Sequence, residues 1–215
     1  MAVWYKAAGS FRKRAAQRKG RSLQQTPEII GIAGSGPSVG VTHMAILTAN
    51  YCAGVLNQRT AVLEWNESGD FGGLERILSK KAVTDSRSGS FNIMGAFYYK
   101  KAGKDELLGC AASGFNAIVI DFGTFRSEIQ DEFLRCDRRF LVGSVSEWKL
   151  DAFAELASQT GTDRRGWEFF SAFGSREALK MTEKLLGIRI RRIPIAGSAF
   201  AITGDILDFF GTFLG

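Results

Sequence analysis

The sequence predicts an α/β domain with one doubly wound, mainly parallel sheet and helices on both faces. Two observations carry this prediction. From residue 27 onward, short apolar runs alternate with segments of helical period, which is the pattern of successive βα units. The chain has 215 residues, enough for one such domain with a large buried core. We therefore expect residues 1–26 to form a separate basic arm and residues 27–215 to form a single domain.

Seven short apolar runs are predicted as strands. They are 28–33, 60–65, 91–98, 116–121, 139–144, 167–172 and 188–193. Between most of them the apolar residues recur with helical period, which predicts helices. These segments are 42–57, 70–80, 104–113, 127–136, 146–158 and 175–186. The polar stretch 79–90, SKKAVTDSRSGS, is predicted as a long surface loop.

The last eleven residues, DILDFFGTFLG, contain Phe209, Phe210, Phe213 and Leu214. So many large apolar side chains rarely stay exposed on a soluble monomer. We therefore predict a helix that packs on the sheet. Attachment of this segment to a membrane is the alternative.

Composition limits the kinds of site that the chain can hold. Cys52, Cys110 and Cys136 are widely spaced, which argues for reduced thiols in the cytoplasm and against a disulfide framework or a zinc site. His43 is the only histidine, so a metal site built from several histidines is excluded. No apolar run approaches the ~18 residues of a membrane span, and no secretory signal is recognisable. We expect no metal site.

Positive charge is concentrated at the N-terminus. The chain has 28 Lys and Arg residues against 22 Asp and Glu residues, a formal net charge of +6. Its first 25 residues carry no acidic side chain, so the domain that follows is close to neutral. The basic residues of the arm are Lys6, Arg12, Lys13, Arg14, Arg18, Lys19 and Arg21.

The arm has the features of a segment that binds an anionic membrane surface. Trp4 and Phe11 fall on one stripe of a helix, with basic residues around them. A solvated tail and a protein partner are the alternatives. Nucleic acid is less favoured, because only the arm carries an excess of positive charge. The predicted location is cytoplasmic, and membrane binding by the arm would place the protein at the inner face of the membrane.

Three segments at predicted strand ends form the candidate site, because ligands of doubly wound sheets bind at the carboxyl ends of the strands. The first begins GIAGSGPSVGVTH at residue 31, where a strand leads through a Gly- and Ser-rich loop into a helix. Backbone N–H groups of such a loop and the following helix N-terminus form an anion pocket. The candidate nucleotide-binding residues are Gly36, Ser38, Val39, Gly40, Val41, Thr42 and His43.

The other two segments supply acidic residues. Glu64 ends the second predicted strand, and Asp121 ends an apolar strand in the usual place of a carboxylate that orders metal-bound water. In a P-loop, Thr42 would be the magnesium-binding hydroxyl, and the residue before it would be a lysine that contacts the β- and γ-phosphates. Val41 offers neither a charge nor a donor. His43 is expected to be neutral, because the helix dipole there disfavours imidazolium. A plain role on the helix surface or in packing is favoured over a neutral imidazole that donates one hydrogen bond to a ligand.

In this order and spacing, the three segments resemble the MinD/ParA family of deviant-Walker P-loop ATPases. The resemblance implies that residues 27–215 form a P-loop NTPase-like domain. The family loop K-G-G-V-G-K-T-T aligns with residues 36–43. The family motif I-D-x-D-P-Q-G, at the end of the second strand, aligns with residues 63–69. Its Walker B aspartate aligns with Asp121. Both family lysines are absent. Val41 stands in place of the P-loop lysine, and Gly36 stands in place of the signature lysine, which in the family reaches across a dimer.

The resemblance implies weak binding of ATP or ADP with magnesium and a homodimer formed through the P-loop face. Each missing lysine removes a charge-assisted contact of about 1.5–3 kcal/mol, so we expect hydrolysis to be lost or very weak. Glu64 replaces an aspartate and is expected to be structural, held by loop N–H groups or a basic residue. The chain looks like the degraded members of the family that serve Tad-type pilus assembly and localisation. That implies a pseudo-ATPase that positions or scaffolds pilus or secretion proteins.

Two alternatives stay open. The first is an ATPase of the same family that is still active. The second is a dinucleotide-binding enzyme, because residues 34–40 fit G-x-G-x-x-x-G and Glu64 lies near the usual ribose-binding position. Pro37 in the loop and the lack of a downstream hydride-transfer pair argue against the enzyme.

Overall fold

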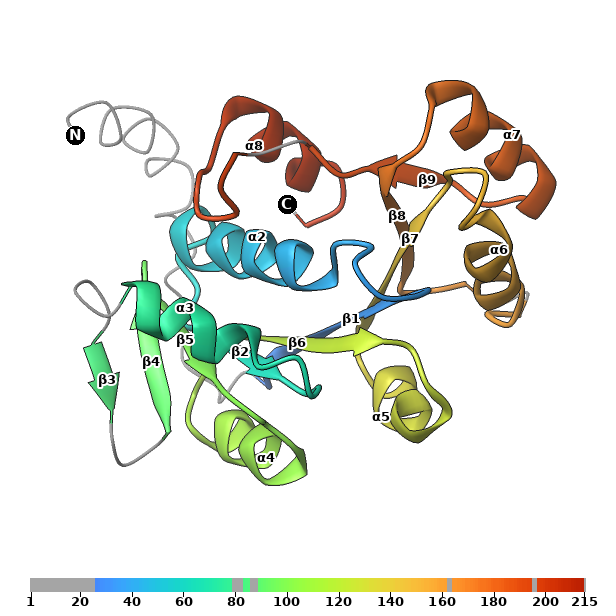
Figure 1. The fold of residues 1–215 in the computed structure, drawn as a ribbon. Coiled ribbons are helices and arrows are strands. Elements are labelled where there is room, and N and C mark those ends of the chain that lie inside the picture. Colours follow the sequence, from blue (N-terminus) through green and yellow to red (C-terminus); the bar gives the residue numbers. More distant parts are fainter. Residues whose placement is uncertain (1–25, 79–82, 86–88, 162–163, 195–196, 215) are drawn as a thin grey trace.

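The computed structural model describes residues 26–78, 83–85, 89–161, 164–194 and 197–214. Within these residues, nine strands form one sheet in the order β3-β4-β5-β2-β6-β1-β7-β8-β9 (Figure 1). The strands are β1 (Glu28–Gly34), β2 (Thr60–Glu64), β3 (Val83–Asp85), β4 (Ser90–Ile93), β5 (Ala96–Tyr99), β6 (Ala117–Thr124), β7 (Arg138–Ser144), β8 (Trp167–Phe173) and β9 (Ile190–Arg192). The six strand pairs from β5 to β9 are parallel, and only the β3–β4 and β4–β5 pairs are antiparallel.

Helices cover both faces of this sheet, which confirms the predicted doubly wound α/β fold (Figure 1). The helices are α2 (Val41–Gly54), α3 (Asp70–Leu78), α4 (Lys104–Ala112), α5 (Gln130–Leu134), α6 (Leu150–Ser158), α7 (Arg176–Leu186) and α8 (Gly204–Gly211). A short 3-10 turn, η1 (Ser127–Ile129), precedes α5. The apolar cores place α2, α3 and α8 on one face and α4 to α7 on the other.

The core forms because the central strands are apolar on both sides. In β1, Ile30 and Ile32 face the α2 side and Ala33 faces the α5 side, and all three are fully buried. Helix α8 lies against α2, where Phe210 stacks on Tyr51 with ring centroids 4.8 Å apart. The predicted C-terminal helix therefore packs in the core instead of facing solvent.

One predicted strand was wrong. Residues 91–98 form a hairpin of β4 and β5, because Met94 (φ 53°) and Gly95 (φ 91°) adopt the left-handed conformation that reverses the chain in two residues. Residues 83–85, which were predicted to lie in a loop, add the edge strand β3 to this hairpin.

Two predicted helices are shorter than expected. Of residues 127–136, the first three form η1 and only the next five form α5. The helix predicted from residue 146 begins at Leu150, because Ser144 and Ser146 fix a turn before it. In that turn the Ser146 N–H donates to Ser144 Oγ at 3.2 Å, and the Lys149 N–H donates to the Ser146 carbonyl at 2.9 Å.

The arm, residues 1–25, lies outside the described residues. This includes every candidate arm residue, from Trp4 to Arg21. In the part of the chain that is described, no helix combines the length and the apolar character needed to cross a bilayer.

Candidate functional site

The loop between β1 and α2 is fastened to the strands on both sides of it. The sheet order places β1 between β6 and β7. On one side the Phe125 N–H donates to the Gly34 carbonyl at 2.8 Å, and on the other the Ser35 N–H donates to the Val142 carbonyl at 2.9 Å. The loop is thereby held at the carboxyl edge of the sheet, where the predicted site was expected.

The strand order also brings the two candidate carboxylates together. β2 pairs with β6 in parallel, and in this register Glu64 lies opposite Asp121. All three predicted segments therefore meet at the same edge. Two residues of the loop, Ser38 (φ 57°) and Gly40 (φ 103°), adopt the left-handed conformation, and Gly40 directly precedes the first turn of α2.

Val41 packs into the core beneath the loop. It is 7% exposed and belongs to the same apolar cluster as Val39 and Met44. A Cβ atom at Gly34 would lie 2.6 Å from Cγ2 of Val41 and 2.8 Å from Cγ2 of Val39, so these side chains close tightly over the end of β1. The position that carries lysine in a P-loop is here an apolar contact between the loop and the strand.

Beside the loop is an open cavity of about 520 Å³. All three predicted segments line it, together with Arg126, which follows β6. Its lining residues are Gly36, Pro37, Ser38, Gly40, Val41, Thr42, His43, Asn66, Glu67, Ser68, Asp70, Gly123, Thr124 and Arg126. Of the predicted loop residues, Val39 is the one that does not line the cavity, because it faces the core.

Glu64 is held inside the protein by the start of α3. It is 1% exposed, and its Oε1 accepts a hydrogen bond from the Phe71 N–H at 2.9 Å. The Ser68 hydroxyl lies at 3.4 Å from the same oxygen. The backbone donor that we expected for Glu64 is thus the N-terminal turn of a helix, which also stabilises a negative charge.

Asp121 is fully buried, and only one of its two carboxylate oxygens accepts hydrogen bonds from described residues. Its Oδ1 accepts from the Gly123 N–H at 2.9 Å and from Asn66 Nδ2 at 3.1 Å. Its Oδ2 has no hydrogen-bond partner among the described residues. Burial, the largest cause, raises the pKa of Asp121 to about 6, and the charge of Glu64 adds to this. The Gly123 N–H and the nearby Thr42 hydroxyl oppose the rise.

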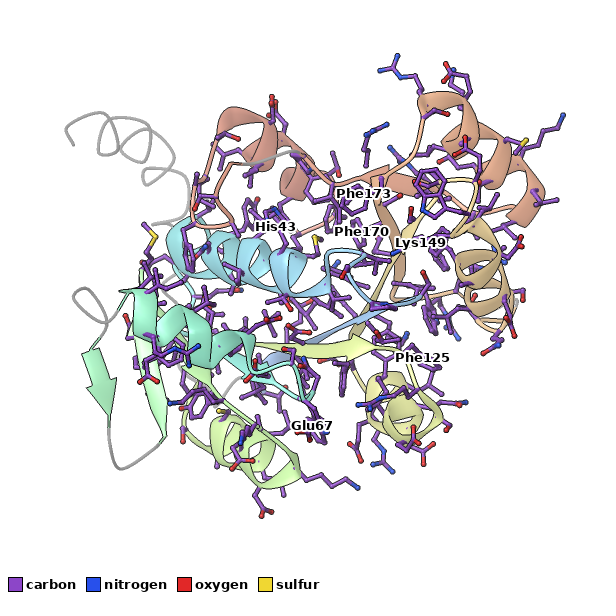
Figure 2. The ribbon with its side chains drawn as sticks, viewed as in Figure 1. His43, Glu67, Phe125, Lys149, Phe170 and Phe173 are labelled. Atoms are coloured by element: carbon purple, nitrogen blue, oxygen red, sulfur yellow. The ribbon has the colours of Figure 1, made fainter. Side chains whose placement is uncertain are left out.

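The two polar residues at the start of α2 are also constrained. The Thr42 hydroxyl donates to Asp70 Oδ2 at 3.2 Å. His43 is half-buried on α2 (Figure 2), and burial lowers its pKa, in line with the neutral imidazole that we expected. Within the described residues, no three His, Cys, Asp or Glu side chains are arranged to hold a metal ion.

Several residues that line the cavity were not among the candidates, and three of them carry side chains that bear on the site: Asn66, Asp70 and Arg126. Asn66 follows Glu64 by two residues, and its amide also donates to the Asp121 carbonyl at 2.9 Å. Asp70 begins α3. Arg126 follows Asp121 by five residues, and only the strand order brings it to the loop. A polar residue soon after each strand end was the available signal for all three.

The strand order bears on the dinucleotide alternative. In the dinucleotide-binding arrangement the first two strands are neighbours in the sheet. Here β6 lies between β1 and β2, so the loop after β1 faces different neighbours. This order does not fit a dinucleotide-binding enzyme.

No protein-family model matches the sequence, and no curated protein matches it. Solved structures of similar fold exist. A plasmid partition protein from Borrelia burgdorferi B31 bound to AMPPNP has a TM-score of 0.59 at 16% identity, covering 88% of this chain and 97% of that chain. A chain of the MinC:MinD cell division protein complex from Aquifex aeolicus has a TM-score of 0.55 at 14% identity, covering 79% of this chain and 82% of that chain. MinD with Mg-ADP from Pyrococcus horikoshii OT3 has a TM-score of 0.53 at 11% identity, covering 79% of this chain and 82% of that chain. The chain therefore has the fold of the MinD/ParA ATPases.

Proposed function

We propose that the chain is a pseudo-ATPase of the MinD/ParA type that positions or scaffolds other proteins and binds ATP or ADP only weakly. The observation that carries this proposal is the burial of Val41. The P-loop lysine contacts phosphates through a charge, whereas Val41 contacts Gly34 and the core. Because phosphoryl transfer depends on electrostatic stabilisation, a loop built this way favours binding without turnover.

The rest of the site is compatible with a nucleotide. The cavity of about 520 Å³ is in the size range of small-molecule sites. The loop and the N-terminus of α2 offer backbone N–H groups to phosphates. The buried Oδ2 of Asp121 has no partner among the described residues and suits a magnesium-bound water. Magnesium would neutralise phosphate charge, and Thr42 and Asp121 would hold it. Two of the solved structures of this fold contain AMPPNP or Mg-ADP, which supports the same ligand class.

The proposal includes a homodimer formed through the P-loop face, with pilus or secretion proteins as further partners. Two large apolar side chains support contact at this edge: Trp148 is 80% exposed and Phe173 is 53% exposed. Trp148 follows the carboxyl end of β7, which neighbours β1, and Phe173 is the last residue of β8, which neighbours β7. The choice of pilus or secretion partners rests on the sequence resemblance to Tad-type members.

The test is a titration of the full-length chain with ATP and magnesium, with product release and light scattering followed in the same samples. We expect weak binding, a dimer, and no ATP turnover above background. Steady hydrolysis that disappears in Asp121→Asn would instead support the active ATPase. A monomer at every nucleotide concentration would remove the homodimer from the proposal.

The basic arm is proposed to attach the protein to an anionic membrane surface. Each basic residue near such a surface contributes about 1 kcal/mol, so seven of them allow reversible attachment. We expect the full-length chain to co-sediment with vesicles containing phosphatidylserine at low salt and to be released as salt rises, because screening shortens the reach of the charges. A chain without residues 1–25 should stay in the supernatant. Equal sedimentation of both proteins would place the membrane contact elsewhere.

A further inference from the structure

The cavity beside the loop is poor in positive charge. Its lining contains two acidic residues, Glu67 and Asp70, and the buried carboxylates of Glu64 and Asp121 lie behind it. Among the described residues that line it, Arg126 is the only permanently charged cation. An anionic ligand bound to the loop could therefore contact one cationic side chain of the cavity wall, that of Arg126.

Arg126 is firmly placed next to the loop. The residue before it, Phe125, donates its N–H to the Gly34 carbonyl at 2.8 Å, and the Arg126 carbonyl accepts from the Ile129 N–H at 3.2 Å. The backbone is therefore fixed on both sides of Arg126. Its side chain is exposed and makes no ion pair or hydrogen bond with another described residue. Arg126 also lines two further cavities, of about 340 and 300 Å³, so its side chain borders three cavities.

Lys149 approaches the loop from the opposite side. It belongs to the turn between β7 and α6, and its Nζ donates to the Pro37 carbonyl at 3.2 Å. An ammonium group has three donors, so two remain for a ligand. Because β1 lies between β6 and β7, a residue after β6 and a residue after β7 flank the loop. Figure 2 shows Lys149 on one side of the end of β1 and Phe125, the neighbour of Arg126, on the other.

We propose that Arg126 and Lys149 bind the phosphate groups of the ligand and replace, within one chain, the positive charge that Val41 and Gly36 do not supply. This inference rests on the proposed nucleotide site. Phosphates on the loop would lie between a guanidinium, which can donate two parallel hydrogen bonds, and an ammonium, which acts as a point charge. Both cations lie outside the P-loop itself, so they stabilise bound phosphate without occupying the position of the P-loop lysine.

The experiment measures binding of ATP with magnesium to the full-length chain by isothermal titration, and repeats it with inorganic tripolyphosphate. Arg126→Ala should weaken both ligands about tenfold, the lower end of the range for a charge-assisted contact at an exposed site. Lys149→Ala should weaken both about threefold or more, because it removes one charge next to the loop. The affinity of Arg126→Lys should fall between those of Arg126→Ala and the unchanged chain. Lysine keeps the positive charge but cannot donate two parallel hydrogen bonds as the guanidinium does.

Lys180→Ala is the matched control, because Lys180 is an exposed cation on α7 and does not line the cavity. It should bind both ligands as the unchanged chain does. Melting temperatures of all variants should agree within a few degrees, which separates lost contacts from lost folding. Equal affinity of Arg126→Ala, Lys149→Ala and Lys180→Ala would overturn the inference and leave the proposed function intact. No binding of ATP or tripolyphosphate to the unchanged chain would overturn both the inference and weak nucleotide binding, but not the absence of turnover.

Discussion

Replacing Asp121 by asparagine should stabilise the protein at neutral pH by at most about 3 kcal/mol. The carboxyl group is fully buried, and burial raises its pKa from 3.8 to about 6. One pKa unit corresponds to about 1.4 kcal/mol, and the shift is about two units. An asparagine keeps the acceptor for Gly123 and Asn66 and removes the buried charge. Thermal or urea unfolding at pH 7.5 measures the difference.

The pH dependence of the free energy of unfolding shows why Asp121→Asn should stabilise the protein and not destabilise it. Between pH 4 and 6 the folded protein retains the proton of Asp121, whereas the unfolded chain loses it, as the raised pKa requires. The free energy of unfolding of the unchanged chain should therefore fall as pH rises through this window. Asp121→Asn should lack that fall, so the two proteins should converge near pH 4. Asp208→Asn, at an exposed position on α8, should show no difference at either pH. A less stable Asp121→Asn at pH 7.5 would contradict the account of this carboxylate.

Replacing Val41 by lysine should destabilise the protein by about 2–4 kcal/mol without restoring ATP turnover. The side chain is 7% exposed and contacts the end of β1, so a charged residue there either is buried or pushes the loop outward. A lysine that extends into the cavity should tighten nucleotide binding. Turnover should stay absent, because Gly36 and Glu64 are unchanged.

Val41→Met is the matched control for this variant, because it adds a similar length without a charge. It should cost less stability than Val41→Lys and leave nucleotide affinity unchanged. Urea unfolding and isothermal titration measure the two effects separately. If Val41→Lys were as stable as the unchanged chain and hydrolysed ATP, the core contact of Val41 would not be what prevents turnover.

The sheet was predictable because its central strands are buried on both faces and therefore form continuous apolar runs. The hairpin was missed for a local reason: Met94 adopts a positive φ, which an apolar run does not indicate. The edge strand β3 was missed because three residues at the border of a sheet carry too short a pattern. The late start of α6 depends on hydrogen bonds of Ser144 and Ser146, which a helical period does not show.

For the site, the sequence located the loop and the two carboxylates, but not their surroundings. The replacement of lysine by Val41 is visible in the sequence, whereas its packing against Gly34 is not. Arg126 and Lys149 reach the loop only because β6 and β7 are the neighbours of β1. That order is set by the packing of the whole sheet, and no local motif records it.

We propose that this loop binds nucleotide without turning it over, and ATP hydrolysis by the full-length chain with magnesium tests the absence of turnover most directly. Phosphate release should equal that of a buffer blank, and Asp121→Asn should give the same value. Sustained release above the blank that Asp121→Asn abolishes would contradict the claim, because the buried carboxylate would then be serving a working ATPase.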